Sequence, residues 1–187
     1  MNADVRRLGR RVLPLYEDID TIWAPAVATR SSCRRGCHHC CYNLAAVSLE
    51  EAIPIAEYIL TSDVWKPELP KIRTELARQV TILDGIGGVQ AGRAMNETAR
   101  KWLDKAIPCV FLKKNGDCGV YKVRPVVCRT YYVVSPPADC SPEKETTVSV
   151  LNAEEVVLCF WADAGISTLE SLQGAVLKAM EMLESCG

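Results

Sequence analysis

The spacing of the cysteines constrains this chain more than any other feature. A first block, within nine residues, contains Cys33, Cys37, Cys40 and Cys41. A second, wider block contains Cys109, Cys118, Cys128 and Cys140. Cys40 and Cys41 are adjacent, and because neighbouring side chains diverge, both would seldom reach one tetrahedral ion. We therefore expect the cysteines to bind metal. Cys40 and Cys41 would then bind different metals, or one of them would not be a ligand.

The sequence indicates a reducing cellular compartment, in which cysteines are expected to bind metal and not to form disulfides. The N-terminal run 5–13 is charged and lacks the apolar stretch and cleavage site of a signal peptide. No segment approaches the roughly 20 apolar residues that a membrane-spanning helix needs. We expect a cytoplasmic protein without a membrane contact, where thiols stay reduced. Ten cysteines then favour metal binding over the disulfide framework of a small secreted chain.

Chain length and net charge restrict the domain organisation and the kinds of binding partner. The 187 residues, 49% of them hydrophobic, suffice for a single domain over residues 1–187, with a cysteine-cluster region at 33–140 and flanking helices at 4–26 and 153–184. A net charge of −1 gives nucleic-acid binding little support. An unidentified protein partner is compatible with the sequence.

Apolar residues at helical spacing predict a mainly α fold. Ser48 and Glu51 have the spacing of a capping box, and Pro14 predicts a break in the first helix. The expected helices cover residues 4–26, 48–60, 68–83, 90–105, 153–164 and 169–183. Asn115-Gly116 predicts a small β-hairpin that carries Cys109 and Cys118.

Arg124-Pro125 predicts the start of a short helix that carries Cys128 and ends at Ser135-Pro136-Pro137. The chain lacks the two paired C-x2-C turns of most zinc sites. Cys33, Cys37 and Cys40 could instead bind three irons of a cubane, with a fourth ligand from a distant segment. The spacing favours an iron–sulfur cluster of the 4Fe-4S type, and zinc stays open as the alternative.

Four ordered motifs carry a family resemblance: CRRGCHHCC at 33–41, PCVFL at 108–112, CGVY at 118–121 and RPVVCRTY at 124–131. Together they resemble the YkgJ-type CxxCxxCC cysteine-cluster family, described as a zinc- or iron-chelating domain. The resemblance covers about residues 33–140, and the first gap is three residues here instead of two. It implies eight metal ligands: Cys33, Cys37, Cys40, Cys41, Cys109, Cys118, Cys128 and Cys140. Cys159 and Cys186 match nothing in the family.

Charged residues beside the cysteines suggest how a cofactor would be held. A centre with four thiolates keeps negative charge that must be offset when it is buried. Arg124 and Arg129 bracket Cys128, and we expect both to contact the cofactor from outside its ligands. His38 and His39, the only histidines, lie inside the first block, where one of them could replace a cysteine.

Three classes of function stay open. The first is a metal or cluster protein whose cofactor serves electron transfer, sensing or folding, and the third is an interaction module whose scaffold is only stabilised by a metal such as structural zinc. A cluster-dependent enzyme is the second class, since a related cluster occurs in flagellin lysine N-methylases. The spacing of the first block also matches radical S-adenosylmethionine enzymes, but the strand–helix alternation of their barrel is missing. No motif identifies catalytic residues for hydrolysis or nucleotide chemistry.

Overall fold

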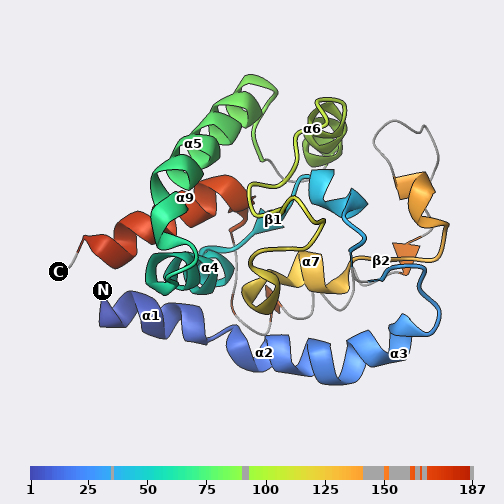
Figure 1. Ribbon diagram of the computed structural model, residues 1–187, viewed down its shortest axis with the longest axis horizontal. Coiled ribbons are helices and arrows are strands. Elements are labelled where there is room, and N and C mark those ends of the chain that lie inside the picture. Colours follow the sequence, from blue (N-terminus) through green and yellow to red (C-terminus); the bar gives the residue numbers. More distant parts are fainter. Residues whose placement is uncertain are drawn as a thin grey trace.

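Helices dominate the computed structural model, as the sequence predicts (Figure 1). It describes residues 1–34, 36–89, 93–140, 150–151, 161–162, 165 and 168–185. The α-helices are α1 (Ala3–Arg10), α2 (Leu13–Asp18), α3 (Ala24–Ala28), α4 (Leu49–Thr61), α5 (Leu69–Gly85), α6 (Arg93–Leu103), α7 (Val126–Thr130) and α9 (Leu172–Glu184). The shorter turns are η1 (Ile19–Trp23), η2 (His39–Tyr42), η3 (Lys66–Glu68), η4 (Tyr121–Val123) and η5 (Pro137–Cys140).

The main hydrophobic core lies between α4, α9, α5 and α1. Helix α4 begins with the predicted capping box, in which the Ser48 hydroxyl accepts from the Glu51 amide and the Glu51 carboxylate accepts from the Ser48 amide. Helices α4 and α9 are buried along facing sides and pack against each other. The chain ends are close, because the Asn2 amide donates to the Leu183 carbonyl at 3.2 Å (Figure 1). The side of this core that faces away from the termini receives the cysteine segments.

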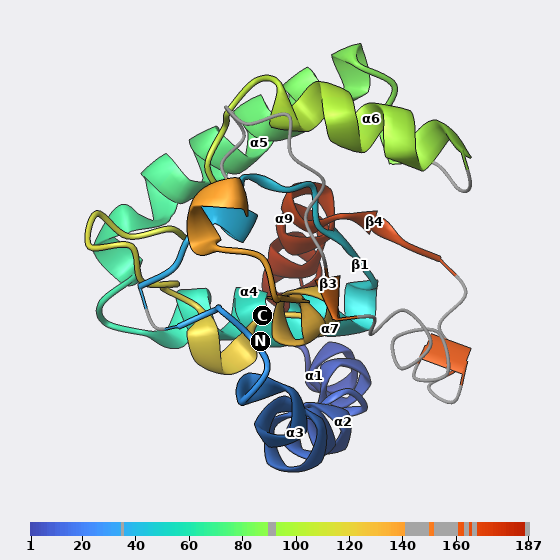
Figure 2. The ribbon, with the colours of Figure 1, turned by 90° about the vertical axis from the view of Figure 1, so that its right-hand side faces the viewer.

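The N-terminal helix is interrupted, as Pro14 predicts. Helix α1 ends at Arg10, α2 begins at Leu13, and the π-helical turn η1 separates α2 from α3. A second, smaller apolar cluster joins this segment to α7 and contains Val12, Tyr16, Ile19 and Val126. Figure 2 shows α1, α2 and α3 on one side of the molecule and α5 and α6 on the opposite side, with α4, α7 and α9 between them.

Two short antiparallel pairs join segments that are distant in the sequence. Strand β1 (Ala46–Val47) pairs with β4 (Glu170–Ser171), with Ala46 opposite Ser171. Strand β2 (Tyr132–Val133) pairs with β3 (Val150–Leu151), with Tyr132 opposite Leu151. The predicted hairpin forms as a tight turn closed by one antiparallel bridge between Leu112 and Cys118. The sequence patterns did not indicate the two long-range pairs.

Most predicted helices are confirmed with shifts of a few residues at their ends. The expected helix 153–164 lies largely outside the described residues, and its last part is helical at Trp161 and Ala162. The predicted end of the Cys128 helix at Ser135–Pro137 was wrong, because α7 ends at Thr130 and the chain continues as β2. Within the described ranges, no helix has the length and apolar character to cross a membrane.

Candidate metal centre

The start of the first cysteine block is fixed to β2. The Ser32 amide donates to the Val133 carbonyl at 2.8 Å, and the Ser31 and Ser32 hydroxyls donate to the same carbonyl. In return, the Val133 amide donates to the Cys33 sulfur at 3.4 Å. This contact orients the thiol and stabilises negative charge on its sulfur.

The rest of the first block folds as two consecutive tight turns. The Cys37 amide donates to the Arg34 carbonyl and the Cys41 amide to the His38 carbonyl, each at 2.9 Å. The Cys37 sulfur accepts from the His39 amide, which lowers the pKa of this thiol, although burial raises it overall. Turn η2 then presents Cys40 and Cys41, and Cys40 is exposed.

The hairpin carries two further thiols and is anchored in the core. Phe111 and Val120 are 1% and 3% exposed and belong to the main core. Their amides donate to the sulfurs of Cys109 and Cys118, two residues earlier in each case. The turn therefore repeats one arrangement twice, in which a buried apolar residue aims its amide at a cysteine.

Two glycines show how closely the hairpin is packed. Gly116, in the turn, has a φ of +82°, and a Cβ there would lie 3.1 Å from both the Gly36 carbonyl oxygen and His38 Nδ1. The hairpin tip therefore lies against the first block. At Gly119 a Cβ would lie 2.8 Å from Trp65 Cη2 and 3.0 Å from the Phe111 oxygen.

A direct hydrogen bond joins the two cysteine blocks at their centre. The Cys109 amide donates to the Cys41 carbonyl at 2.7 Å. On another side, turn η5, which ends at Cys140, packs against η2. Segments separated by up to a hundred residues therefore meet around Cys40 and Cys41.

Helix α7 carries Cys128, and a buried carboxylate accepts a hydrogen bond from the backbone at its start. Pro125 caps its start in an extended conformation, and the Val126 amide donates to Glu51 Oε1 at 2.8 Å. Glu51 is fully buried, and burial raises its pKa. The Cys128 side chain is exposed. Glu51 thus fixes the first turn of the helix that presents this cysteine.

The environment of the thiols favours their protonated form before metal binds. Burial raises the pKa of Cys109 to about 12, with smaller effects of Cys118 and Cys40. Burial also raises the pKa of Cys128 well above its ordinary value, with contributions of the neighbouring Cys109, Cys40 and Cys118. Cys128 lies among many protein atoms while solvent still reaches its side chain. A metal cation would replace these protons and offset the mutual repulsion of the thiolates.

Arg124 supplies positive charge to the second block. Its side chain stacks on the Tyr121 ring at 3.7 Å, and its Nη1 donates to the Tyr121 carbonyl at 3.0 Å. The charge of Arg124 lowers the pKa values of Cys40, Cys118 and Cys128, against the larger effect of burial on Cys118 and Cys128. The guanidinium therefore lies where it can offset thiolate charge.

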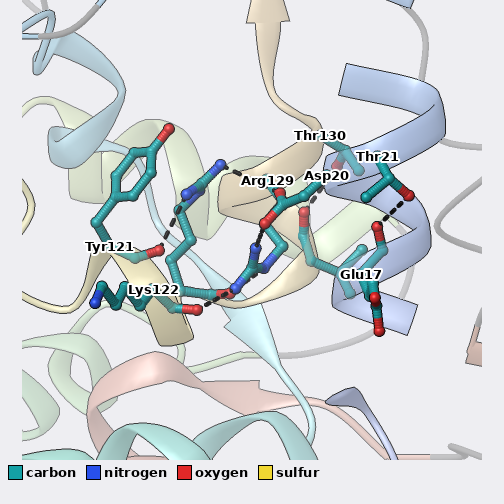
Figure 3. Close-up of polar contacts among 9 residues, drawn as sticks. Glu17, Asp20, Thr21, Tyr121, Lys122, Arg129 and Thr130 are labelled. Carbon is teal, nitrogen blue, oxygen red and sulfur yellow. Dashed lines mark hydrogen bonds and ion pairs between the residues drawn. The ribbon is translucent and has the colours of Figure 1, made fainter. Parts of the chain in front are cut away.

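Arg129 has structural partners. It is 1% exposed, and it pairs with Asp20 and donates to the carbonyls of Lys122 and Arg124 (Figure 3). It also lies over the Tyr16 ring at 4.1 Å. The side chain thus joins α7 and η4 to the N-terminal helical segment. No local pattern in the sequence indicates Asp20 or Tyr16 as partners, because both are more than a hundred residues away.

The other cysteines and histidines of the chain are two histidines of the first block and two cysteines outside both blocks. His38 and His39 stack with their ring centroids 5.5 Å apart, and His38 Nδ1 lies 3.2 Å from the Gly36 carbonyl oxygen. Cys159 and Cys186 lie outside the described residues. Among the described cysteines, histidines and carboxylates, no three are grouped closely enough to bind one metal ion.

The thiolate donors of this arrangement are suited to zinc and to an iron–sulfur cluster. Four thiolates at 2.3 Å from one zinc ion would have sulfurs about 3.8 Å apart. A cubane binds each thiolate to a different iron, so its ligand sulfurs lie further apart. Soft thiolate donors, amide donors aimed at sulfur and the charge of Arg124 suit either cofactor.

One comparison with known proteins identifies the family. Residues 32–154 match the model of the CxxCxxCC family, whose description reads "Putative zinc- or iron-chelating domain". No curated protein and no solved structure matches the chain. The match covers well over half of the 187 residues and includes all eight cysteines of the two blocks. The chain therefore belongs to the CxxCxxCC family of metal-chelating cysteine domains.

Proposed function

We propose that this metal-binding protein carries an iron–sulfur cofactor of the 4Fe-4S type, bound by cysteines of both blocks and used for electron transfer. The observation that carries the proposal is the spacing of the donors. All eight cysteines of the two blocks are described, and within the described part of the chain no three donors have the grouping that a single ion requires. A cluster that bridges more widely spaced sulfurs suits this arrangement.

Amide donors to sulfur support a redox role. The sulfurs of Cys33, Cys37, Cys109 and Cys118 each accept a backbone amide. Hydrogen bonds to ligand sulfurs stabilise negative charge and are one of the means by which proteins set cluster potentials. Arg124 adds positive charge on the same side.

Exposure of the thiols supports exchange of electrons with a partner. Cys40 and Cys128 are exposed residues, so a cofactor bound to them would lie near the protein surface. A redox protein could then approach it directly. The same cofactor would also stabilise the fold, because it would join η2, the hairpin and α7.

Anaerobic purification from iron-replete cells tests the identity of the metal. We expect a brown protein with iron and acid-labile sulfide in equal amounts, and a visible absorption band that dithionite bleaches. A colourless protein with stoichiometric zinc would contradict the proposal. Redox titration tests the use of the metal: a reversible one-electron couple within the range known for protein clusters, about −700 to +450 mV, is expected. If no titrant reduces or oxidises the cluster, the proposed electron transfer is wrong and the cluster serves only to stabilise the fold.

A further inference from the structure

We propose that Gln79, a buried residue of α5, is a positioning residue for the proposed metal ligand Cys109. Gln79 acts through the carbonyl group of Pro108, the residue directly before the cysteine. The inference rests on the proposed ligation by cysteines of both blocks, and it adds a residue that orients one ligand without touching the metal. It holds for zinc as well as for an iron–sulfur cluster.

The polar atoms of the Gln79 side chain all have partners inside the core. The residue is 0% exposed. Its Nε2 donates to the Pro108 carbonyl at 3.1 Å and to Glu75 Oε1 at 2.8 Å. Its Oε1 accepts from Nε2 of Gln173, in α9, at 2.9 Å. Because an amide nitrogen has two hydrogens, both are in use, and the three contacts together fix the orientation of the side chain.

The contact with Pro108 holds the segment before Cys109 to the helical core. Proline has no backbone N–H, so its carbonyl is the one backbone group with which it can form a hydrogen bond. Among the residues that the structure describes, Gln79 is the one donor to this carbonyl. The chain is therefore hydrogen-bonded to α5 one residue before the cysteine.

Gln79 and Cys41 bind opposite sides of one peptide plane. The Pro108 carbonyl and the Cys109 amide belong to the same planar peptide unit. The carbonyl accepts from Gln79, and the amide donates to the Cys41 carbonyl at 2.7 Å. Two hydrogen bonds on opposite sides of a plane fix its rotation. They therefore fix the direction in which the Cys109 side chain leaves the backbone.

Stability of the helix packing does not explain this pair of buried glutamines. Helices α5 and α9 pack against each other, and Gln173 is 4% exposed. In the described part of the chain, Gln173 Oε1 is buried without a hydrogen-bond partner. An unpaired buried acceptor destabilises a fold, and apolar residues of the same shape in place of a buried polar pair are close to neutral or stabilising. The contact with Pro108 is what an apolar pair could not provide.

Two variants separate positioning from stability. In Gln79→Met/Gln173→Met both glutamines become apolar side chains of similar length. The metal-loaded double variant should release metal to excess chelator under argon about tenfold faster than the wild type. Amide hydrogen exchange in α5 and α9 should be as slow as in the wild type or slower. The circular dichroism of the metal–sulfur absorption bands should also change, because it reports the geometry at the ligands.

Gln173→Met alone is the matched control. It retains the hydrogen bond from Gln79 to Pro108 but leaves Gln79 Oε1 without its donor. Hydrogen exchange in α5 and α9 should therefore become faster, while metal release and the circular dichroism stay as in the wild type. Wild-type metal release in the double variant would overturn the inference. Faster release that follows faster exchange in both variants would also overturn it.

A second comparison applies if the double variant does not fold. Gln79→Met is then compared with Ile72→Val, which removes a buried methyl group from the same helix and no hydrogen bond. Faster metal release from Gln79→Met at equal hydrogen exchange would support the inference, and equal release would overturn it. Zinc in the purified protein would contradict only the iron–sulfur proposal. Full metal content in Cys109→Ser would show that Cys109 is not a ligand and would overturn the inference.

Discussion

The carboxylate of Glu51 and the backbone amide of Val126 form a buried hydrogen bond of 2.8 Å between the starts of two helices. The other carboxylate oxygen of Glu51 accepts from the amide and hydroxyl of Ser48 and caps α4. One side chain thus satisfies free amides at the start of α4, in the core, and of α7, which carries Cys128. The position of Cys128 therefore depends on a residue that is not a candidate ligand.

Glu51→Gln should change how stability depends on pH. Burial raises the pKa of Glu51, so the folded state keeps this proton at pH values at which the unfolded chain has lost it. The contribution is complete below the unfolded pKa of about 4.3 and is lost as the pH rises through the folded value. Denaturant unfolding at several pH values should therefore show the wild type losing its advantage over the variant as the pH rises.

The hydrogen bonds of Glu51 determine how much stability the Glu51→Gln variant should lose, and Glu50→Gln is the control. Glutamine has a single acceptor oxygen and cannot accept from both the Ser48 and the Val126 amides, so Glu51→Gln should cost about 1 kcal/mol at low pH. Glu50→Gln makes the same change at the next position of the same helix, where the side chain is only partly buried. Its loss of stability should be smaller than that of Glu51→Gln. A Glu51→Gln difference that grows with pH would contradict the account.

Asp20→Asn should destabilise the protein far more than a matched surface change. Arg129 is 1% exposed and its only described carboxylate partner is Asp20, so the variant would leave a buried guanidinium without a counter-charge. We expect the free energy of unfolding to fall by about 2 kcal/mol. The loss is smaller than for a fully buried ion pair, because Asp20 is partly exposed. Chemical denaturation of the metal-loaded protein would measure it.

Glu184→Gln provides the comparison, since it removes the carboxylate from the surface pair with Arg73. Exposed pairs contribute at most about 1 kcal/mol. Equal losses in the two variants would show that the Arg129 contacts do not hold α7 to the N-terminal segment.

Gly119→Ala should loosen the hairpin. A Cβ at this position would meet the Trp65 ring and the Phe111 oxygen within 3.0 Å, and both belong to the packing that holds the hairpin to the core. We expect a loss of about 1–3 kcal/mol and weaker retention of metal during gel filtration with a chelator. Gly85→Ala, where a Cβ meets nothing within 4 Å, should be neutral or gain up to about 1 kcal/mol. A tolerated Gly119→Ala would contradict the packing argument.

Features set by neighbouring residues could be predicted from the sequence. The Ser48 capping box, the break near Pro14 and the Asn115-Gly116 turn each depend on a few consecutive residues, and each is present. The mainly helical class follows from the same local periodicity.

Features that depend on distant residues could not be predicted. Glu51 was interpreted only as a helix cap, because nothing in its spacing indicates Val126, 75 residues later. The partner of Arg129 is 109 residues away, where no local pattern indicates it, and contact of this arginine with a cofactor stays a prediction. The pairing of β1 with β4 likewise joins residues that no local pattern relates. Ligation by all eight cysteines stays a prediction.

X-ray absorption at the iron and zinc edges of the anaerobically purified protein tests the central claim most directly. The account predicts iron bound by sulfur, with a second shell of iron at the short distance of a cluster, and no stoichiometric zinc. Zinc surrounded by four sulfurs, without a neighbouring metal, would contradict it.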